Sequence, residues 1–173
     1  FRFPENGGVI DVALGIDIGS VSTNVVLLDR QGQIVREIYT RTQARPVEVV
    51  TAALAELQAE LGTRVRVVAA GTTGSGRELI GELVGADTIN DEITAHKTGS
   101  AFIARTMLDG RGDTIFEIAG QDSKYIRIEA GIVVDFAMNE ACAAGTGSFL
   151  EEQAEKLGIN IKGEFARLAL SAP

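Results

Sequence analysis

Cysteine, basic charge and long hydrophobic runs are all scarce in this sequence, and each scarcity excludes a class of protein. The 173 residues contain one cysteine, Cys142, so no disulfide can form within the chain. Lysine and arginine number 16 against 24 aspartates and glutamates, which gives a formal net charge of −8. Nucleic-acid binding needs a basic surface that releases counterions, so we expect no nucleic-acid partner. A nucleotide pocket is not excluded, because it depends on local residues.

No apolar run reaches the roughly 18 residues that span a bilayer, so we expect no membrane segment. The first residues, Phe1–Pro4, lack the basic stretch and apolar core of a secretory signal, and the cytoplasm is the expected compartment. The sequence also lacks an initiator methionine, so we expect it to be a piece of a longer chain. Its 45% hydrophobic and 23% charged residues suit one domain or two small lobes.

The hydrophobic pattern predicts an α/β fold. Three strands are predicted at the start, and their very short loops require antiparallel pairing: Val12–Ile18, Asn24–Asp29 and Ile34–Thr40. A helix is predicted to begin at Pro46 and end at Gly62. The elements predicted next are a strand at Val65–Ala70, a loop at Gly71–Gly76, and helices at Glu78–Val84 and Asp91–Leu108, the last capped by Asn90 or Asp91.

A second set of the same elements begins near Thr114. The predicted strands are Thr114–Ile118, Tyr125–Glu129 and Ile132–Phe136, and the predicted helices are Thr146–Leu157 and Glu164–Leu170. We interpret this order as a weak architectural repeat. The expected domains are a first lobe at residues 1–112 and a partial second lobe at residues 113–173.

Two hairpin turns contain residues that can bind phosphate. The first follows the acid Asp17 and contains small or polar residues whose N–H groups and hydroxyls can ring phosphate oxygens: Gly19, Ser20, Ser22 and Thr23. Asp17 itself can hold a hydrated Mg²⁺. An ordinary acidic strand end with a polar turn is the alternative. The second hairpin, Glu117–Lys124, repeats the pattern, and two such hairpins facing each other can clamp a polyphosphate.

Three further segments have both a functional and a structural interpretation. Cys142 lies in a glycine-rich run before a helix start, where a thiolate ligand is favoured, yet a lone cysteine is usually a small buried hydrophobe. Glu92 and His96 share one helix face; Glu92 suits an active-site acid or simply complements the helix dipole, and no further metal ligands accompany His96. The loop Gly71–Arg77 lacks the lysine of a P-loop and can line a nucleotide cleft or form a solvated turn.

In this order the segments resemble the activator proteins of 2-hydroxyacyl-CoA dehydratases and benzoyl-CoA reductases, from Val12 to Ala172. The run Cys142–Gly147 is the most specific part of the resemblance. The resemblance implies an actin-like ATPase (ribonuclease H-like) fold. It also implies a homodimer with one [4Fe-4S] cluster between subunits, which uses ATP and Mg²⁺ to deliver a low-potential electron to a partner dehydratase or reductase.

The resemblance also implies roles for individual residues. Asp17 and its turn would form the first phosphate loop, and the second would consist of Gly120, Gln121 and Asp122. Glu92 would lie near the catalytic water or Mg²⁺, and Cys142 would be the first cluster ligand. Asn139 and Gly145–Gly147 would shape the helix start beside that ligand.

The chain departs from the family pattern at Glu117 and Ala119, where members often carry Asp and Gly. A longer acid and an added methyl group can shift the second loop. The second cluster cysteine and the adenosine-binding segment are expected downstream of Pro173. Two other functions stay open: a small-molecule kinase of the same superfamily, acting on a sugar or acid, and a domain in which nucleotide only regulates assembly.

Overall fold

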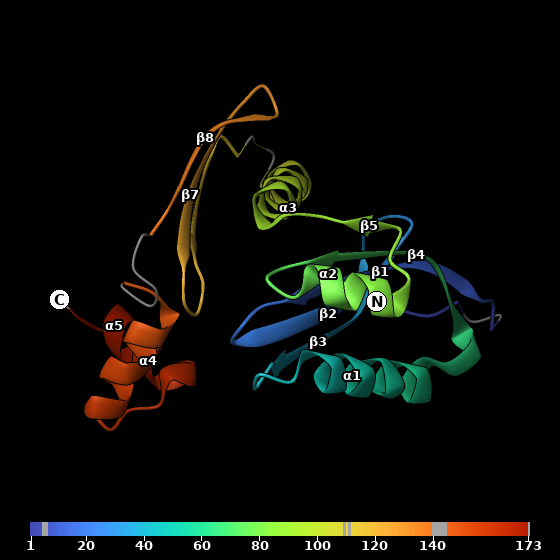
Figure 1. The fold of residues 1–173 in the computed structure, drawn as a ribbon, viewed down its shortest axis with the longest axis horizontal. Coiled ribbons are helices and arrows are strands. Elements are labelled where there is room, and N and C mark those ends of the chain that lie inside the picture. The colour runs from blue at the N-terminus through green and yellow to red at the C-terminus, as the bar shows by residue number, and fades with distance from the viewer. Residues whose placement is uncertain (5–6, 109, 111, 140–144, 173) are drawn as a thin grey trace. The chain divides into compact units, whose positions relative to one another are not determined.

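The computed structural model describes the chain except residues 5, 6, 109, 111, 140–144 and 173. It forms two compact units, Phe1–Ala95 and His96–Pro173, which we describe separately. Figure 1 shows their elements in chain order. The lobe boundary at residue 112 was predicted from the point where the second series of strands begins, and it stays a prediction.

The first unit is a five-stranded mixed sheet in the order β3-β2-β1-β4-β5 (Figure 1). Its strands are β1 Ile10–Ile18, β2 Ser22–Asp29, β3 Ile34–Arg41, β4 Val65–Thr73 and β5 Thr88–Ile89. The first three strands pair antiparallel, as their short loops require, whereas β4 pairs parallel with both β1 and β5. The carboxyl ends of β1, β4 and β5 therefore lie at the same edge of the sheet.

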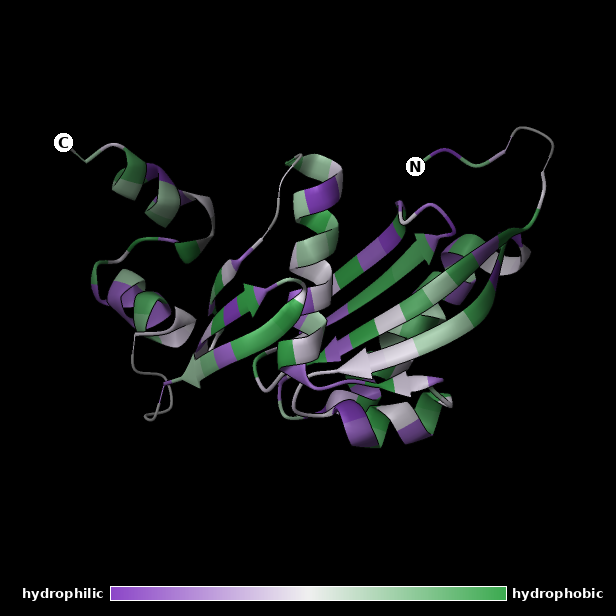
Figure 2. Cartoon of the chain, turned by 90° about the horizontal axis from the view of Figure 1, so that it is seen from above, coloured by the Kyte–Doolittle hydropathy of each residue, from purple (hydrophilic) through white to green (hydrophobic). Residues whose placement is uncertain are grey.

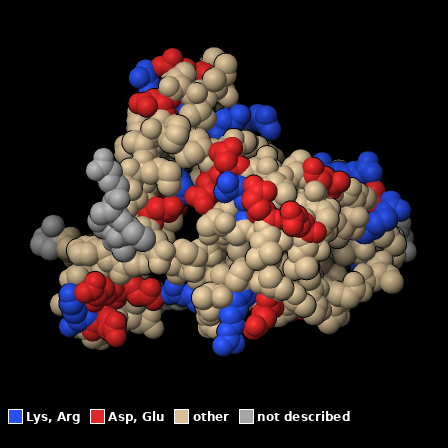
Figure 3. All heavy atoms as spheres, viewed as in Figure 1, with Lys and Arg blue, Asp and Glu red and all other residues tan. Residues whose placement is uncertain are grey.

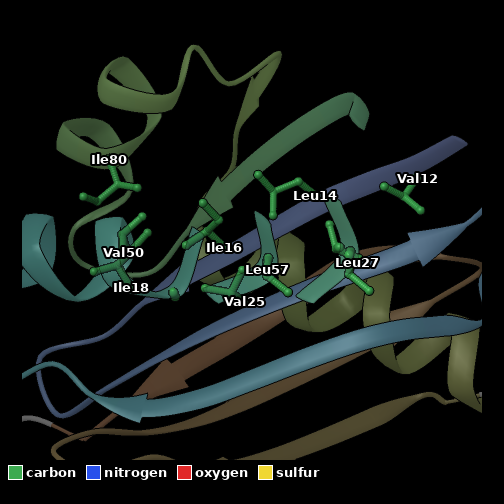
Figure 4. Packing of buried hydrophobic residues seen from close by; sticks show 11 residues of the cluster. Val12, Leu14, Ile16, Ile18, Val25, Leu27, Val50, Leu57 and Ile80 are labelled. Carbon is green, nitrogen blue, oxygen red and sulfur yellow. The ribbon is translucent and has the colours of Figure 1, made fainter. Parts of the chain in front are cut away.

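Helix α1, Pro46–Leu61, packs on one face of this sheet. Pro46 occupies the first turn, and the helix ends at Gly62, whose φ of 53° suits glycine. Its buried residues recur at helical spacing: Val50, Ala53, Leu57 and Leu61. They form one core cluster with alternate residues of β1 and β2, namely Val12, Leu14, Ile16, Ile18, Val25 and Leu27. Figure 4 shows Val50 and Leu57 among these strand residues. The helices in Figure 2 carry hydrophobic and hydrophilic residues in turn, as expected for elements with one buried face.

The segment after β4 differs from the sequence prediction. Gly71–Thr73, predicted as a loop, continues β4, because these residues pair with β1 and two of them also pair with β5. The two-residue strand β5 was not predicted. A 3-10 turn, Gly62–Arg64, precedes β4, and helix α2, Arg77–Val84, follows it and ends at Gly85 in the left-handed conformation. Helix α3 spans Glu92–Met107.

The second unit contains a three-stranded antiparallel sheet in the order β6-β7-β8. Its elements are β6 Thr114–Ile118, β7 Ser123–Glu129, β8 Ile132–Met138, α4 Gly147–Lys156 and α5 Ala166–Leu170. The helix predicted to begin at Glu164 begins later, because Ile161–Phe165 forms a π-helical turn ahead of α5. The three strands occupy the order and directions of β1, β2 and β3, so the predicted repeat of the leading hairpins is present.

No helix among the described residues is long and apolar enough to cross a membrane. On the face shown in Figure 3, the lysine and arginine side chains lie in separate groups between acidic ones. Among the described residues, no continuous basic stripe is visible on this face in Figure 3.

Candidate phosphate-binding hairpins

The carboxyl edge of the parallel strands in the first unit gathers polar side chains. Asp17 lies near the end of β1 and is paired in register with Thr73, the last residue of β4. The backbone N–H of Asn90, directly after β5, donates to the Thr72 carbonyl at 2.9 Å. Glu92 begins α3 two residues later, so it follows the same edge. Ligands of open α/β sheets bind at such carboxyl edges.

Two polar side chains of neighbouring strands are paired in register with Asp17. Asn24, its partner on β2, donates from Nδ2 to Asp17 Oδ2 at 3.3 Å. The Thr73 hydroxyl is buried and has no hydrogen-bond partner among the described residues. A buried hydroxyl without a partner is costly, so an ordered water or a polar ligand is expected to hydrogen-bond to it. Carboxylate and hydroxyl oxygens suit a hydrated Mg²⁺ ion, and in this respect the residues fit the cation expected with ATP.

The first turn is braced by a chain of hydroxyls. Thr42 donates to the Gly19 carbonyl at 2.7 Å, so the single proton of its hydroxyl is used there. The fully buried Thr23 therefore donates to Thr42, at 3.0 Å. Gly19 closes the turn by donating its N–H to the Ser22 carbonyl at 2.9 Å. Thr23 thus holds the turn from beneath, while Ser20 at the tip is exposed; contact of these residues with phosphate stays a prediction.

The loop between β4 and α2 packs directly against the end of β1. Gly76 N–H donates to the Ile18 carbonyl at 3.0 Å, and the Ser75 hydroxyl donates to the same oxygen at 3.3 Å. Gly74 has a φ of +88°, and a Cβ there would lie 2.5 Å from the Ile18 oxygen and 2.6 Å from Asp17 Oδ1. Only glycine allows this approach. The loop therefore lies beside Asp17, which the sequence pattern left undecided.

The second hairpin has the same pairing register as the first. Asp17 pairs with Asn24, and Glu117 pairs with Lys124 at the corresponding register position. The closing bond recurs as well, because the N–H of Ala119 donates to the Asp122 carbonyl at 2.9 Å. This match confirms that Glu117 and Ala119 occupy the positions of Asp17 and Gly19. The turn also closes with alanine in that position.

A buried lysine lies among the acids of the second hairpin. The side chain of Lys124 is 2% exposed, and its Nζ donates to Glu117 Oε2 at 3.1 Å and to Asp122 Oδ1 at 2.9 Å. His96 Nε2 lies 3.9 Å from the same Glu117 oxygen. The sequence prediction named Asp122 but not Lys124, because its burial depends on the pairing of β6 with β7.

Helix α4 is attached to the second turn by its first residues. The N–H groups of Gly147 and Ser148 donate to the carbonyls of Ala119 and Gly120, at 2.8 and 2.9 Å. The Thr146 hydroxyl also donates to the Gly120 carbonyl, at 3.0 Å. These helix-start N–H groups thus bind the turn itself and hold Gly120 in place. Gln121, at the tip, is exposed.

The predicted metal ligand Cys142 lies outside the described residues. Among the residues the structure does describe, no three His, Cys, Asp or Glu side chains gather as a metal site. The Asn139 side chain accepts from the Ser123 N–H at 2.8 Å, so it is bound to the first residue of β7. Asp91 is the cap of α3, one of the two predicted candidates, since its Oδ1 accepts from the Thr94 N–H at 2.9 Å.

Known proteins resemble the chain in sequence and structure. The activator of lactoyl-CoA dehydratase from Anaerotignum propionicum is 36% identical over 152 residues, 83% of this chain and 53% of the relative. Component A of the (R)-2-hydroxyglutaryl-CoA dehydratase of Acidaminococcus fermentans matches with a TM-score of 0.77 and 27% identity, covering 94% of this chain and 60% of that one. The ADPNP-bound activator of 2-hydroxyisocaproyl-CoA dehydratase from Clostridium difficile matches with a TM-score of 0.70 and 29% identity, covering 86% and 53%.

The chain thus spans about half the length of the relatives it matches. These matches confirm the predicted α/β fold of the actin-like ATPase type and the resemblance to dehydratase activators. Residues 14–169, nearly the whole chain, match the sequence model of one protein family. The chain therefore belongs to the BadF/BadG/BcrA/BcrD ATPase family.

Proposed function

We propose that this chain binds and hydrolyses ATP with Mg²⁺ as part of a longer protein that activates a dehydratase-type enzyme. The observation that carries the proposal is the group at the carboxyl edge of β1 and β4. There Asp17 accepts a hydrogen bond from Asn24 and lies beside the Thr73 hydroxyl, which has no partner among the described side chains. The family and the ADPNP-bound relative support a nucleotide as the ligand.

Each residue has a distinct part in this proposal. Asp17 binds the water shell of Mg²⁺, and Asn24 keeps the carboxylate in place. Mg²⁺ neutralises phosphate charge and orients the phosphates when it is bound. In the first unit, the backbone of Gly19–Ser22 would contact phosphate oxygens, and Glu92 would orient the attacking water. In the second unit, the backbone of Gly120–Asp122 would form a phosphate loop of its own. Hydrolysis then needs little covalent chemistry from the protein beyond positioning and charge stabilisation.

The partner and the electron-transfer step form the finer part of the proposal. Relatives are activators of 2-hydroxyacyl-CoA dehydratases, which supports a dehydratase or reductase as the partner. A [4Fe-4S] cluster bridging two copies requires four thiolates. The 173 residues contain Cys142 alone, so this chain by itself does not supply a full ligand set. A homodimer in which each copy adds a second cysteine from outside these residues would complete it.

The test of ATP binding compares two aspartates on the same strand. Asp17→Asn keeps the shape of the side chain but removes the charge that holds the cation. Asp11→Asn is the matched control, because Asp11 lies towards the other end of β1 and is paired with Arg30 and Arg66 at the surface. We expect Asp17→Asn to lower Mg²⁺-dependent ATP turnover by about a hundredfold or more, and Asp11→Asn to leave it within about twofold.

Calorimetry with ADPNP and Mg²⁺ on the full-length protein gives the binding constants of both variants. Equal ATP turnover in the two variants would show that Asp17 does not take part in hydrolysis. Phosphate transfer to a sugar or acid would instead establish the kinase, and binding without turnover would establish the regulatory domain. Iron content after anaerobic reconstitution, with Cys142→Ala as the control, tests the cluster separately. A cluster that persists in Cys142→Ala would exclude Cys142 as its ligand.

A further inference from the structure

The two hairpins balance their charges in different ways. At three matching positions the first hairpin carries Asp17, Ser22 and Asn24, which together have one negative charge. The second hairpin carries Glu117, Asp122 and Lys124 at those positions. Two carboxylates and one ammonium again leave one negative charge. The extra acid of the second turn is therefore offset by a lysine where the first hairpin has an amide.

The burial of Lys124 shows how this balance is made. Its side chain is 2% exposed, whereas the side chains of Glu117 and Asp122 are 20% and 37% exposed. A buried ammonium is stable only when it is paired and hydrogen-bonded, and here it reaches one oxygen of each acid. Lys124 thus lies beneath the two carboxylates, and Asp122 is the member of the group most open to solvent.

We propose that Lys124 is the positioning residue of the second phosphate loop. Its ammonium fixes the carboxylates of Glu117 and Asp122 and limits the loop to one negative charge, so that the anionic phosphates of a nucleotide can bind there. Lys124 acts through these two acids, and it holds Asp122 by one carboxylate oxygen next to the turn that binds phosphate. This role rests on the proposed ATP binding.

The internal repeat supplies the variants for a test. Lys124→Asn leaves two carboxylates without their cation, and Asp122→Ser removes the extra acid. The double variant Asp122→Ser/Lys124→Asn restores at both positions the residue types of the first hairpin. Lys156→Asn is the control, because Lys156 forms an exposed ion pair with Glu152 at 2.8 Å in the same unit.

The measurements are calorimetric binding of ADPNP with Mg²⁺ and steady-state ATP turnover, both on the full-length protein. We expect Lys124→Asn to weaken ADPNP binding by about tenfold or more, since it leaves uncompensated charge beside the phosphates. The double variant should bind ADPNP within about threefold of the unaltered protein, because its three matching positions again carry one negative charge. Lys156→Asn should match the unaltered protein in both measurements.

Two results would overturn the proposal. One is a Lys124→Asn protein that melts at a lower temperature but binds ADPNP normally, which would make Lys124 a structural residue only. The other is a double variant that folds but binds ADPNP about tenfold or more weakly than the unaltered protein. This result decides the matter even where Lys124→Asn does not fold. Failure of the unaltered protein to bind ADPNP would instead refute the proposed ATP binding, and the role proposed for Lys124 would be refuted with it.

Discussion

Asp17 and Thr73 are paired in register on the parallel strands β1 and β4, and the buried hydroxyl of Thr73 has no hydrogen-bond partner among the described residues. Paired residues of neighbouring strands point to the same face of a sheet, so the hydroxyl and the carboxylate share one side. The Gly74 backbone comes within van der Waals reach of the same carboxylate. The pairing of β1 with β4 thus places Thr73 and Gly74, which are more than fifty positions away in the sequence, beside one acid.

Thr73→Val separates the stability of the fold from ligand binding. Valine has nearly the shape of threonine but lacks the hydroxyl, so it removes a buried polar atom whose burial costs about 1–3 kcal/mol when unpaired. We expect the variant to melt, without nucleotide, at the same or a higher temperature. If the hydroxyl meets the ligand, the rise in melting temperature on adding ADPNP and Mg²⁺ should shrink. An unchanged rise would show that the hydroxyl does not contribute to binding.

Gly74→Ala and Gly62→Ala test the close approach of the loop to β1. Both glycines have positive φ, a conformation that residues with a Cβ rarely adopt, so alanine strains the backbone at either position. A Cβ at Gly62 meets nothing within 4 Å, whereas at Gly74 it clashes with Ile18 and Asp17. We expect Gly74→Ala alone to weaken ADPNP binding, measured by calorimetry. Equal binding in the two variants would show that the loop position does not matter to the ligand.

Local signals in the sequence were enough to predict the hairpins and the first helix. The short turns after Ile18 and Asp29 require antiparallel strands, and Pro46 and Gly62 mark the first residue of α1 and the residue that ends it. The cap of α3 was also predictable, since Asn90 and Asp91 were the candidates and Asp91 caps it. These features depend on residues within a few positions of one another.

Features that depend on pairing between distant segments were not predictable. Gly71–Thr73 has the composition of a loop and becomes a strand because β1 and β5 lie on either side of it. Thr42 braces the first turn from 23 residues away, and no local pattern indicates that bond. The burial of Lys124 likewise follows from the pairing of β6 with β7. Sequence reasoning therefore named the acids of the hairpins but missed the groups that position them.

Ala130→Asn tests the strain in the turn between β7 and β8. Ala130 and Gly131 have φ values of 49° and 81°, and such two-residue turns favour Asn-Gly. We expect the variant to gain about 0.5–1 kcal/mol in free energy of unfolding, because asparagine tolerates positive φ better than alanine. Ala59→Asn is the control: this exposed residue of α1 should lose about 0.5 kcal/mol through lower helix propensity. Changes of the same sign in both would contradict a conformational cause.

The cap of α3 predicts a pH dependence of stability with a defined sign. The backbone N–H of Thr94, and then its hydroxyl, hold the pKa of the Asp91 carboxyl below its usual value of 3.8. A carboxyl whose pKa is lowered by folding stabilises the protein above the unfolded pKa, and this contribution is lost as the pH falls through the folded pKa.

Asp91→Asn keeps an acceptor for the Thr94 N–H but has no charge, whereas Asp91→Ala removes the cap. At pH 7 we expect Asp91→Ala to cost about 1 kcal/mol and Asp91→Asn about 0.3–1 kcal/mol, the latter from the helix dipole. Urea unfolding between pH 7 and pH 3 should show the gap between Asp91 and Asp91→Asn closing below pH 4, because the carboxyl is then increasingly protonated. A gap that stays constant over this range would show that the charge of Asp91 does not stabilise the start of α3, the helix that carries Glu92.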